Sequence, residues 1–266
     1  MAREEERSEP GRAGPGFVRI HATGATGFLG TELLALRPHA TGERVEIRDA
    51  GAVRALFQRL RPDVVVHTAY RQDGDGAREI VVDGSENVAR AAVAVGARLV
   101  HLSTDVIFDG RKGAPYIESD VPSPCTEYGR AKADAEERVV VAAPDALLVR
   151  TSLIVGGPGH APSKHELAAR NPQATFYEDE IRSPVQVGDL AAAVLELAAL
   201  DLSGQLNVAG ADDVSRADLA ELVTGAPVRR APAPSDRPLD CSLDSSRARD
   251  LLATRLRGVR EVFGFG

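Results

Sequence analysis

Residues 17–30 read FVRIHATGATGFLG, an apolar run that passes into three glycines spaced three residues apart. The run Phe17 to Ala22 is typical of a buried strand, and Phe28 to Leu36 has the apolar spacing of a helix. Between a strand and a helix, glycines permit a tight turn and a close approach of the backbone to a ligand. This stretch therefore predicts a strand–turn–helix unit whose turn can hold a pyrophosphate at the helix N-terminus.

Further along the chain, short apolar runs alternate with helical patterns. We expect strands at Val45–Ile47, Val64–Val66, Arg98–Leu102, Leu147–Arg150 and Gln205–Val208. Further helices are expected after Asp49 as far as Arg61-Pro62, from Tyr128 through Val140, and over Asp189–Leu200. Strands that are apolar throughout are typical of a sheet covered on both faces. The alternation predicts an α/β fold with a doubly wound parallel sheet of the Rossmann type.

The predicted division of the chain starts with a flexible tail over residues 1–16, which have almost no apolar content. A dinucleotide-binding domain follows over 17–155 and is completed by about 185–208. Residues 156–184 and 209–266 are expected to form a small substrate-binding lobe, because prolines and glycines interrupt the periodicity after Gly156.

Composition narrows the class of protein. The 266 residues are 43% hydrophobic and carry a net charge of −7, so a nucleic-acid partner is not expected. No apolar run is long enough for a membrane span and no signal-peptide pattern is present, so we expect a cytoplasmic protein. Cys125 and Cys241 form no CxxC or Cys/His cluster, which predicts free thiols and no metal site.

Tyr128 and Lys132 are the best candidates for proton transfer. A spacing of four places the phenol and the ammonium on one helix face, one turn apart. A phenol has a pKa near 10, and a nearby cation is expected to ease its proton exchange. Ser103, Thr104 and Asp105 end an expected strand, where ligands bind in such sheets.

Other catalytic schemes find little support. Six histidines are present, yet there is no GxSxG elbow and no serine and histidine are grouped. We expect the histidines to be scattered over surface and loops, with His160 and His165 as possible lid residues beside the pocket.

Four segments carry a resemblance to a known family: residues 102–110 (LSTDVIFDG), 128–132 (YGRAK), 149–156 (VRTSLIVG) and 179–184 (DEIRSP). The chain resembles the extended short-chain dehydrogenases/reductases, and within them the dTDP-4-dehydrorhamnose reductase family. The resemblance implies NAD(P)H-dependent reduction of a keto group on a nucleotide-linked deoxysugar, by a monomer or a homodimer.

The resemblance also implies residue roles. Thr104 would bind the substrate carbonyl oxygen, Tyr128 would donate the proton, and Lys132 would hold the nicotinamide ribose. The implied cofactor-binding residues are Gly24, Thr26, Gly27, Phe28, Leu29, Gly30, Glu46, Ile47, Thr68, Ala69, Tyr70, Tyr128 and Lys132. The implied substrate-binding residues are Thr104, Asp105, Val106 and Arg182. For Arg182 a plain surface ion pair is the alternative.

The segment between Gly30 and Glu46 is shorter than in the family. Sixteen positions from Glu32 to Ile47 cannot hold a helix of about 11 residues and two strands of 5 or 6. One strand is therefore expected to be absent or vestigial. The choice between NAD(H) and NADP(H) stays open, with Arg37, Arg44 and Arg48 as candidates for a 2′-phosphate.

Two other functions stay open. The chain also resembles the regulatory β subunit of methionine adenosyltransferase, a dinucleotide-binding protein that binds a partner protein without turnover. A ketoreductase or epimerase acting on another small molecule would use the same scaffold. The presence of Thr104, Tyr128 and Lys132 together favours an enzyme.

Overall fold

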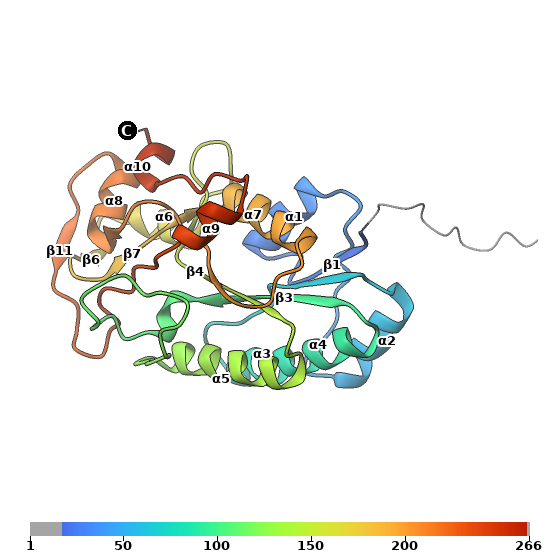
Figure 1. The fold of residues 1–266 in the computed structure, drawn as a ribbon. Helices are drawn as coiled ribbons and strands as arrows, with labels where there is room; N and C mark the ends of the chain where they lie inside the picture. The colour runs from blue at the N-terminus through green and yellow to red at the C-terminus, as the bar shows by residue number, and fades with distance from the viewer. Residues whose placement is uncertain (1–17, 265–266) are drawn as a thin grey trace, which may run out of the picture.

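The computed structural model describes residues 18–264, and the expected tail over residues 1–16 lies outside them. The architecture is a central parallel sheet with helices on both faces and a group of short strands and helices at one end (Figure 1). This confirms the expected α/β class. Within residues 18–264, no helix is both long and apolar enough to cross a membrane.

The sheet has five strands in the order β1-β2-β3-β4-β9, all parallel to their neighbours. The strands are β1 (Ile20–Thr23), β2 (Val64–His67), β3 (Arg98–Thr104), β4 (Leu147–Thr151) and β9 (Gly204–Asn207). Every residue of β2 and β4 is buried. Coverage on both faces explains why these strands are apolar without the alternation of a half-exposed sheet.

Two groups of helices cover the two faces. Helices α1 (Phe28–Leu36), α7 (Val187–Ala199) and α9 (Ser246–Leu251) share one hydrophobic core with Val64 and Val66 of β2. Helices α2 (Ala50–Leu60), α4 (Asp83–Ala94) and α5 (Glu127–Ala142) share the other core with Val65. The short helix α3 (Ala77–Val81) lies with this second group (Figure 1). Successive strand residues therefore alternate between the two cores, as a pleated sheet requires.

The segment between α1 and α2 contains no named strand. Thr41 forms one isolated bridge to His21, so the strand expected beside β1 is vestigial, as the sequence predicts. The prediction of a strand at Val45–Ile47 is wrong, because these residues form no strand. The Ile47 side chain is buried, but its carbonyl accepts a hydrogen bond from the Asn87 side chain at 3.0 Å instead of pairing with a strand.

The remaining elements form the lobe at the end of the sheet. The strands are β5 (Ile154–Val155), β6 (Thr175–Tyr177), β7 (Ile181–Arg182), β8 (Val185–Gln186), β10 (Val214–Ser215) and β11 (Arg229–Ala231). The helices are α6 (Lys164–Ala169), α8 (Arg216–Thr224) and α10 (Val259–Val262), and a 3₁₀ turn, η1 (Asp105–Ile107), follows β3. These strands pair as β5 with β8, β6 with β11 and β7 with β10. The predicted domain limits themselves stay a prediction.

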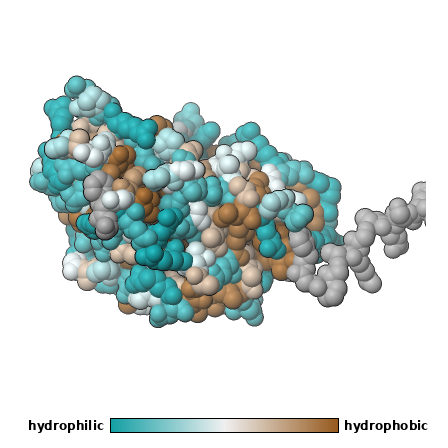
Figure 2. All heavy atoms as spheres, turned by 90° about the horizontal axis from the view of Figure 1, so that it is seen from above, coloured by the Kyte–Doolittle hydropathy of each residue, from teal (hydrophilic) through white to brown (hydrophobic). Residues whose placement is uncertain are grey.

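The surface over α1, α7 and α9 mixes hydrophilic and apolar residues (Figure 2). The brown areas in that view are patches between teal regions.

Candidate active site

The glycine turn connects β1 to α1, and two of its glycines are required by close packing. Gly24 has a φ of +71°, and a Cβ there would lie 2.7 Å from the backbone nitrogen of Ala69. A Cβ on Gly30 would overlap the carbonyl of Gly24. Helix α1 has no side-chain cap at its N-terminus, so the amides of its first turn stay available to a ligand. This end of α1 is therefore suited to an anion such as a pyrophosphate.

A cavity of about 340 Å³ opens beside this turn. Its wall combines residues from the glycine turn, the ends of β2, β3 and β4, helix α5 and the start of α6. The carboxyl ends of parallel strands are where ligands bind in open α/β sheets. The cavity therefore lies where the sequence predicts a ligand site.

Tyr128 and Lys132 both line the cavity from α5. Helix α5 begins there because Thr126 caps it, accepting a hydrogen bond from the Gly129 amide at 3.0 Å. Lys132 is 5% exposed, and its Nζ donates a hydrogen bond to the carbonyl oxygen of Leu102 at 2.6 Å. The two side chains thus share one face, as their spacing predicts.

The ionisation of this pair differs from the expectation. Burial raises the pKa of Tyr128, and the nearby Tyr70 and Asp105 raise it further. Burial also lowers the pKa of Lys132 to about 8. The ammonium is satisfied by the Leu102 carbonyl, and Lys132 is not among the groups that shift the phenol. The phenol is therefore held protonated, the state that a proton donor needs.

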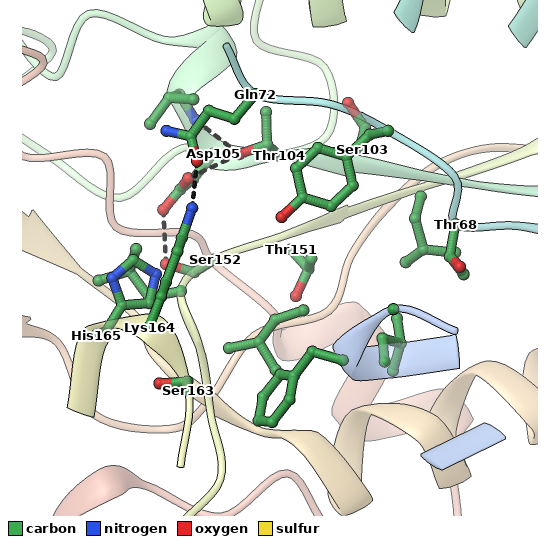
Figure 3. Close-up of a pocket in the computed structure, with 18 of the residues that line it drawn as sticks. Thr68, Gln72, Ser103, Thr104, Asp105, Thr151, Ser152, Ser163, Lys164 and His165 are labelled. Carbon is green, nitrogen blue, oxygen red and sulfur yellow. Dashed lines mark hydrogen bonds between the residues drawn. The ribbon is translucent and has the colours of Figure 1, made fainter. Parts of the chain in front are cut away.

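Thr104 and Asp105 lie at the junction of β3 and η1. The Thr104 hydroxyl donates to Asp105 Oδ1 at 3.1 Å, and Ser152 Oγ donates to Asp105 Oδ2 at 2.6 Å (Figure 3). Asp105 is 2% exposed, and burial raises its pKa even though the Arg182 guanidinium opposes this shift. The carboxylate therefore holds the wall of the cavity together.

Several polar residues of the cavity were given no role from the sequence, although Ser103 was noted at the end of an expected strand. Ser103 and Thr151 are buried, and their hydroxyl oxygens have no hydrogen-bond partner among the described residues. Gln72 and Lys164 also line the cavity, and the Lys164 ammonium donates a hydrogen bond to the Gln72 side chain (Figure 3). The end of the adjacent parallel strand was the one signal that could have identified Thr151, as it had already indicated Ser103.

The predicted site residues divide into two groups. The cavity is lined by Gly27, Phe28, Leu29, Gly30, Thr68, Tyr70, Thr104, Asp105, Val106, Tyr128 and Lys132. Outside its lining lie Gly24, Thr26, Glu46, Ile47, Ala69 and Arg182. His165 lines the cavity as well, whereas His160 binds Glu32 at 3.2 Å and Gln186 at 3.0 Å.

Two residues outside the lining differ from what was expected of them. The alternative of a surface ion pair for Arg182 is wrong: the side chain is 3% exposed and its nitrogens donate to the carbonyls of Pro238 and Leu239 at 3.0 and 2.5 Å. Its Nε lies 3.7 Å from Asp105, so it supports the cavity wall from behind. Arg48 forms an exposed ion pair with Glu46 at 2.9 Å, which engages both residues.

Comparisons with known proteins give a consistent result. A model of the RmlD substrate binding domain matches residues 18–263. A dTDP-4-dehydrorhamnose reductase of Mycobacterium tuberculosis is 34% identical over 238 residues, which cover 84% of this chain and 76% of that protein. Methionine adenosyltransferase 2 subunit beta of Pongo abelii is 29% identical over 285 residues, covering 90% and 83%.

A crystal structure of dTDP-4-dehydrorhamnose reductase from Bacillus anthracis in complex with NADP superposes with a TM-score of 0.81. The two chains are 25% identical, and the match covers 93% of this chain and 97% of that one.

Proposed function

The chain belongs to the RmlD substrate binding domain family, and we propose that it is an NAD(P)H-dependent reductase of a keto group on a nucleotide-linked deoxysugar. The observation that carries this proposal is the convergence of Thr104, Tyr128 and Lys132 on one cavity that also contains the glycine turn. A proton donor, a buried cation and a phosphate-binding turn beside one cavity are what such a reduction needs.

The residues present fit a nicotinamide dinucleotide. The uncapped N-terminus of α1 and the glycines at 24, 27 and 30 would hold the pyrophosphate, with Phe28 and Leu29 over it. Lys132 and Tyr128 would contact the nicotinamide ribose. The unpartnered hydroxyls of Ser103 and Thr151 offer two further hydrogen-bonding groups within the same wall. When bound, the reduced nicotinamide supplies the hydride for the carbonyl carbon.

The protein's own residues manage the proton. Tyr128 donates its phenolic proton to the carbonyl oxygen, since its raised pKa keeps it protonated at neutral pH. Thr104 turns its hydroxyl from Asp105 to the same oxygen and so orients the substrate. Lys132, whose ammonium binds the Leu102 carbonyl at 2.6 Å, holds the wall beside Tyr128 and would orient the nicotinamide ribose there.

A second function has one observation in its favour. The similarity to methionine adenosyltransferase 2 subunit beta covers 90% of this chain, so a dinucleotide-binding regulatory subunit is the alternative. Ketoreduction or epimerisation of another small molecule is a third. The polar, buried wall around Thr104 and Tyr128 favours catalysis over a purely regulatory role.

The test is a cofactor-oxidation assay with a panel of keto nucleotide sugars and matched free keto sugars. We expect oxidation of NADPH or NADH with a nucleotide-linked 4-keto-6-deoxysugar and none with the free sugars. If the protein binds the dinucleotide tightly but no sugar of the panel causes oxidation of NADPH or NADH, the proposal is contradicted and the regulatory subunit is favoured. Turnover of a free keto compound alone would favour the third function.

A further inference from the structure

A group of basic residues lies on the lobe side of the cavity. Lys164 and His165 begin α6 and line the cavity, and Arg216 begins α8 behind them. The Arg216 guanidinium donates from Nη1 to His165 Nδ1 at 3.1 Å. Since a guanidinium can only donate, Nδ1 must be the accepting nitrogen, and the proton of the neutral ring lies on Nε2. His165 therefore has an N–H donor besides its contact with Arg216.

These cations lack acidic partners. Among residues 18–264, no carboxylate lies within ion-pair distance of Lys164 or Arg216. Two carboxylates raise the pKa of Arg216 by their charge, but each forms an ion pair with another arginine: Asp105 with Arg182 at 3.7 Å and Glu180 with Arg237 at 2.5 Å. The carboxylate of Asp73 raises the pKa of Lys164 by its charge, but it lies beyond ion-pair distance.

The local charge is therefore unbalanced. The two pairs neutralise Arg182 and Arg237, which leaves Lys164 and Arg216 as excess positive charge. Burial together with Arg216, Lys164 and Arg182 lowers the pKa of His165 to about 3, so the ring is neutral and adds no charge of its own. Lys164 is exposed, whereas Arg216 is half-buried, and an unpaired charge near the protein interior is unfavourable unless a counter-ion binds.

We propose that Lys164, His165 and Arg216 form the subsite for the phosphate groups of the nucleotide-linked substrate, an inference that rests on the function proposed above. Lys164 Nζ and His165 Nε2 donate to the phosphate oxygens. Arg216 fixes the orientation of His165 and contributes its charge. The excess of two positive charges matches a nucleoside diphosphate linkage, which carries about two negative charges.

The position separates this anion from the pyrophosphate of the cofactor. Figure 3 shows Lys164 and His165 on one side of the cavity and Thr68 on the other. Thr68 follows β2 and packs beside Gly24 of the glycine turn. The reacting groups Thr104 and Tyr128 belong to the same cavity wall. A substrate held by its phosphates at α6 can therefore extend its sugar toward these groups.

The inference is tested by binding dTDP to the protein saturated with NADPH, followed by calorimetry. The variants are Lys164→Gln and Arg216→Gln, and thymidine is the probe that lacks phosphate. Arg170→Gln is the matched control, because Arg170 ends α6 with an exposed side chain outside the cavity lining. We expect the Kd of dTDP to rise at least about tenfold in both variants, as for the loss of a charge-assisted hydrogen bond. Thymidine binding and the Arg170→Gln protein should be unchanged.

A stability measurement guards against misfolding. Arg216→Gln removes a cation without leaving an acid unpaired, so its Tm is expected to be no lower than that of the parent protein. If it does not fold, Arg216→Lys keeps the charge but loses the planar fork that holds His165, and should weaken dTDP binding by a smaller factor.

The failures of the two proposals can be told apart. An unchanged Kd for dTDP in Lys164→Gln and the Arg216 variants, or no dTDP binding to the parent protein, overturns the subsite. Turnover of keto nucleotide sugars with unaltered KM in these variants overturns the subsite and leaves the reductase standing. A phosphate-dependent loss of dTDP binding without any turnover supports the subsite and contradicts the reductase.

Discussion

Lys132→Met is expected to stabilise the free protein at neutral pH, because the ammonium it removes is buried at a cost. Burial lowers the pKa of Lys132 from 10.5 to about 8. Each pKa unit corresponds to about 1.4 kcal/mol, so keeping the charge in the folded state costs roughly 3 kcal/mol. The loss of the hydrogen bond to the Leu102 carbonyl, which leaves that oxygen unpaired, offsets about 1–2 kcal/mol. The net gain is about 1–2 kcal/mol.

The gain depends on pH with a definite sign. Between about pH 8 and 10.5 the folded protein binds fewer protons at Lys132 than the unfolded chain does, so the parent protein gains stability as the pH rises through this window. The advantage of Lys132→Met is therefore complete below about pH 8. It disappears toward pH 10.5, where the variant becomes the less stable protein because it lacks the bond to Leu102.

Urea unfolding at pH 7 and pH 10.5 measures both effects. Lys112→Met is the control, since Lys112 forms a partly exposed ion pair with Asp120 and its loss should destabilise by at most about 1 kcal/mol. A destabilised Lys132→Met protein at pH 7, or a gain that is equal at both pH values, would refute the idea that burial of the ammonium opposes folding.

Three further predictions concern the proposed reaction. Tyr128→Phe removes the proton donor and should lower turnover by about two to four orders of magnitude with nearly unchanged cofactor binding, so unaltered kcat would remove Tyr128 from the mechanism. Gly27→Val places a branched side chain where the turn lines the cavity, with its Cβ 3.1 Å from the Gly24 carbonyl. Calorimetry should then detect no dinucleotide binding to a protein that still unfolds cooperatively. Retained affinity for the dinucleotide would mean that the glycines only connect β1 to α1 and do not bind the cofactor. NADPH and NADH should bind within about tenfold of each other, roughly 1.4 kcal/mol, because the strand beside β1 is vestigial and Arg48 is engaged by Glu46. If titrations give Kd values for NADPH and NADH that differ by several hundredfold, residues other than these must distinguish the two cofactors.

Much of the fold could be predicted because strands that are covered on both faces of the sheet are apolar throughout, and such runs are easily recognised in the sequence. Helix α1 spans Phe28–Leu36 as expected, and the apolar runs near Val64 and Leu147 are strands. The strand expected at Val45–Ile47 is absent because two apolar residues flanking Glu46 form a strand only if a partner strand exists. Here Ile47 buries its side chain under α4 while Asn87 binds its carbonyl.

The site was predicted less completely than the fold. Tyr128, Lys132 and the glycine turn are local patterns, so spacing alone identifies them. Lys164 and Arg216 are single basic residues that no local pattern separates from surface charges. Their role depends on the packing of α6 against α8, which brings His165 and Arg216 together across 51 positions of sequence. Long-range packing of this kind is not visible in periodicity.

We propose that this chain reduces the keto group of a nucleotide-linked sugar with hydride from a nicotinamide cofactor. The most direct measurement supplies cofactor deuterated at the transferable position, together with a nucleotide-linked 4-keto-6-deoxysugar, and analyses the product by mass spectrometry. We predict a reduced nucleotide sugar that carries a single deuterium at the former carbonyl carbon, formed by the parent protein and strongly diminished with Tyr128→Phe. Recovery of the keto sugar unreduced, from a protein that binds the cofactor tightly, would contradict the account.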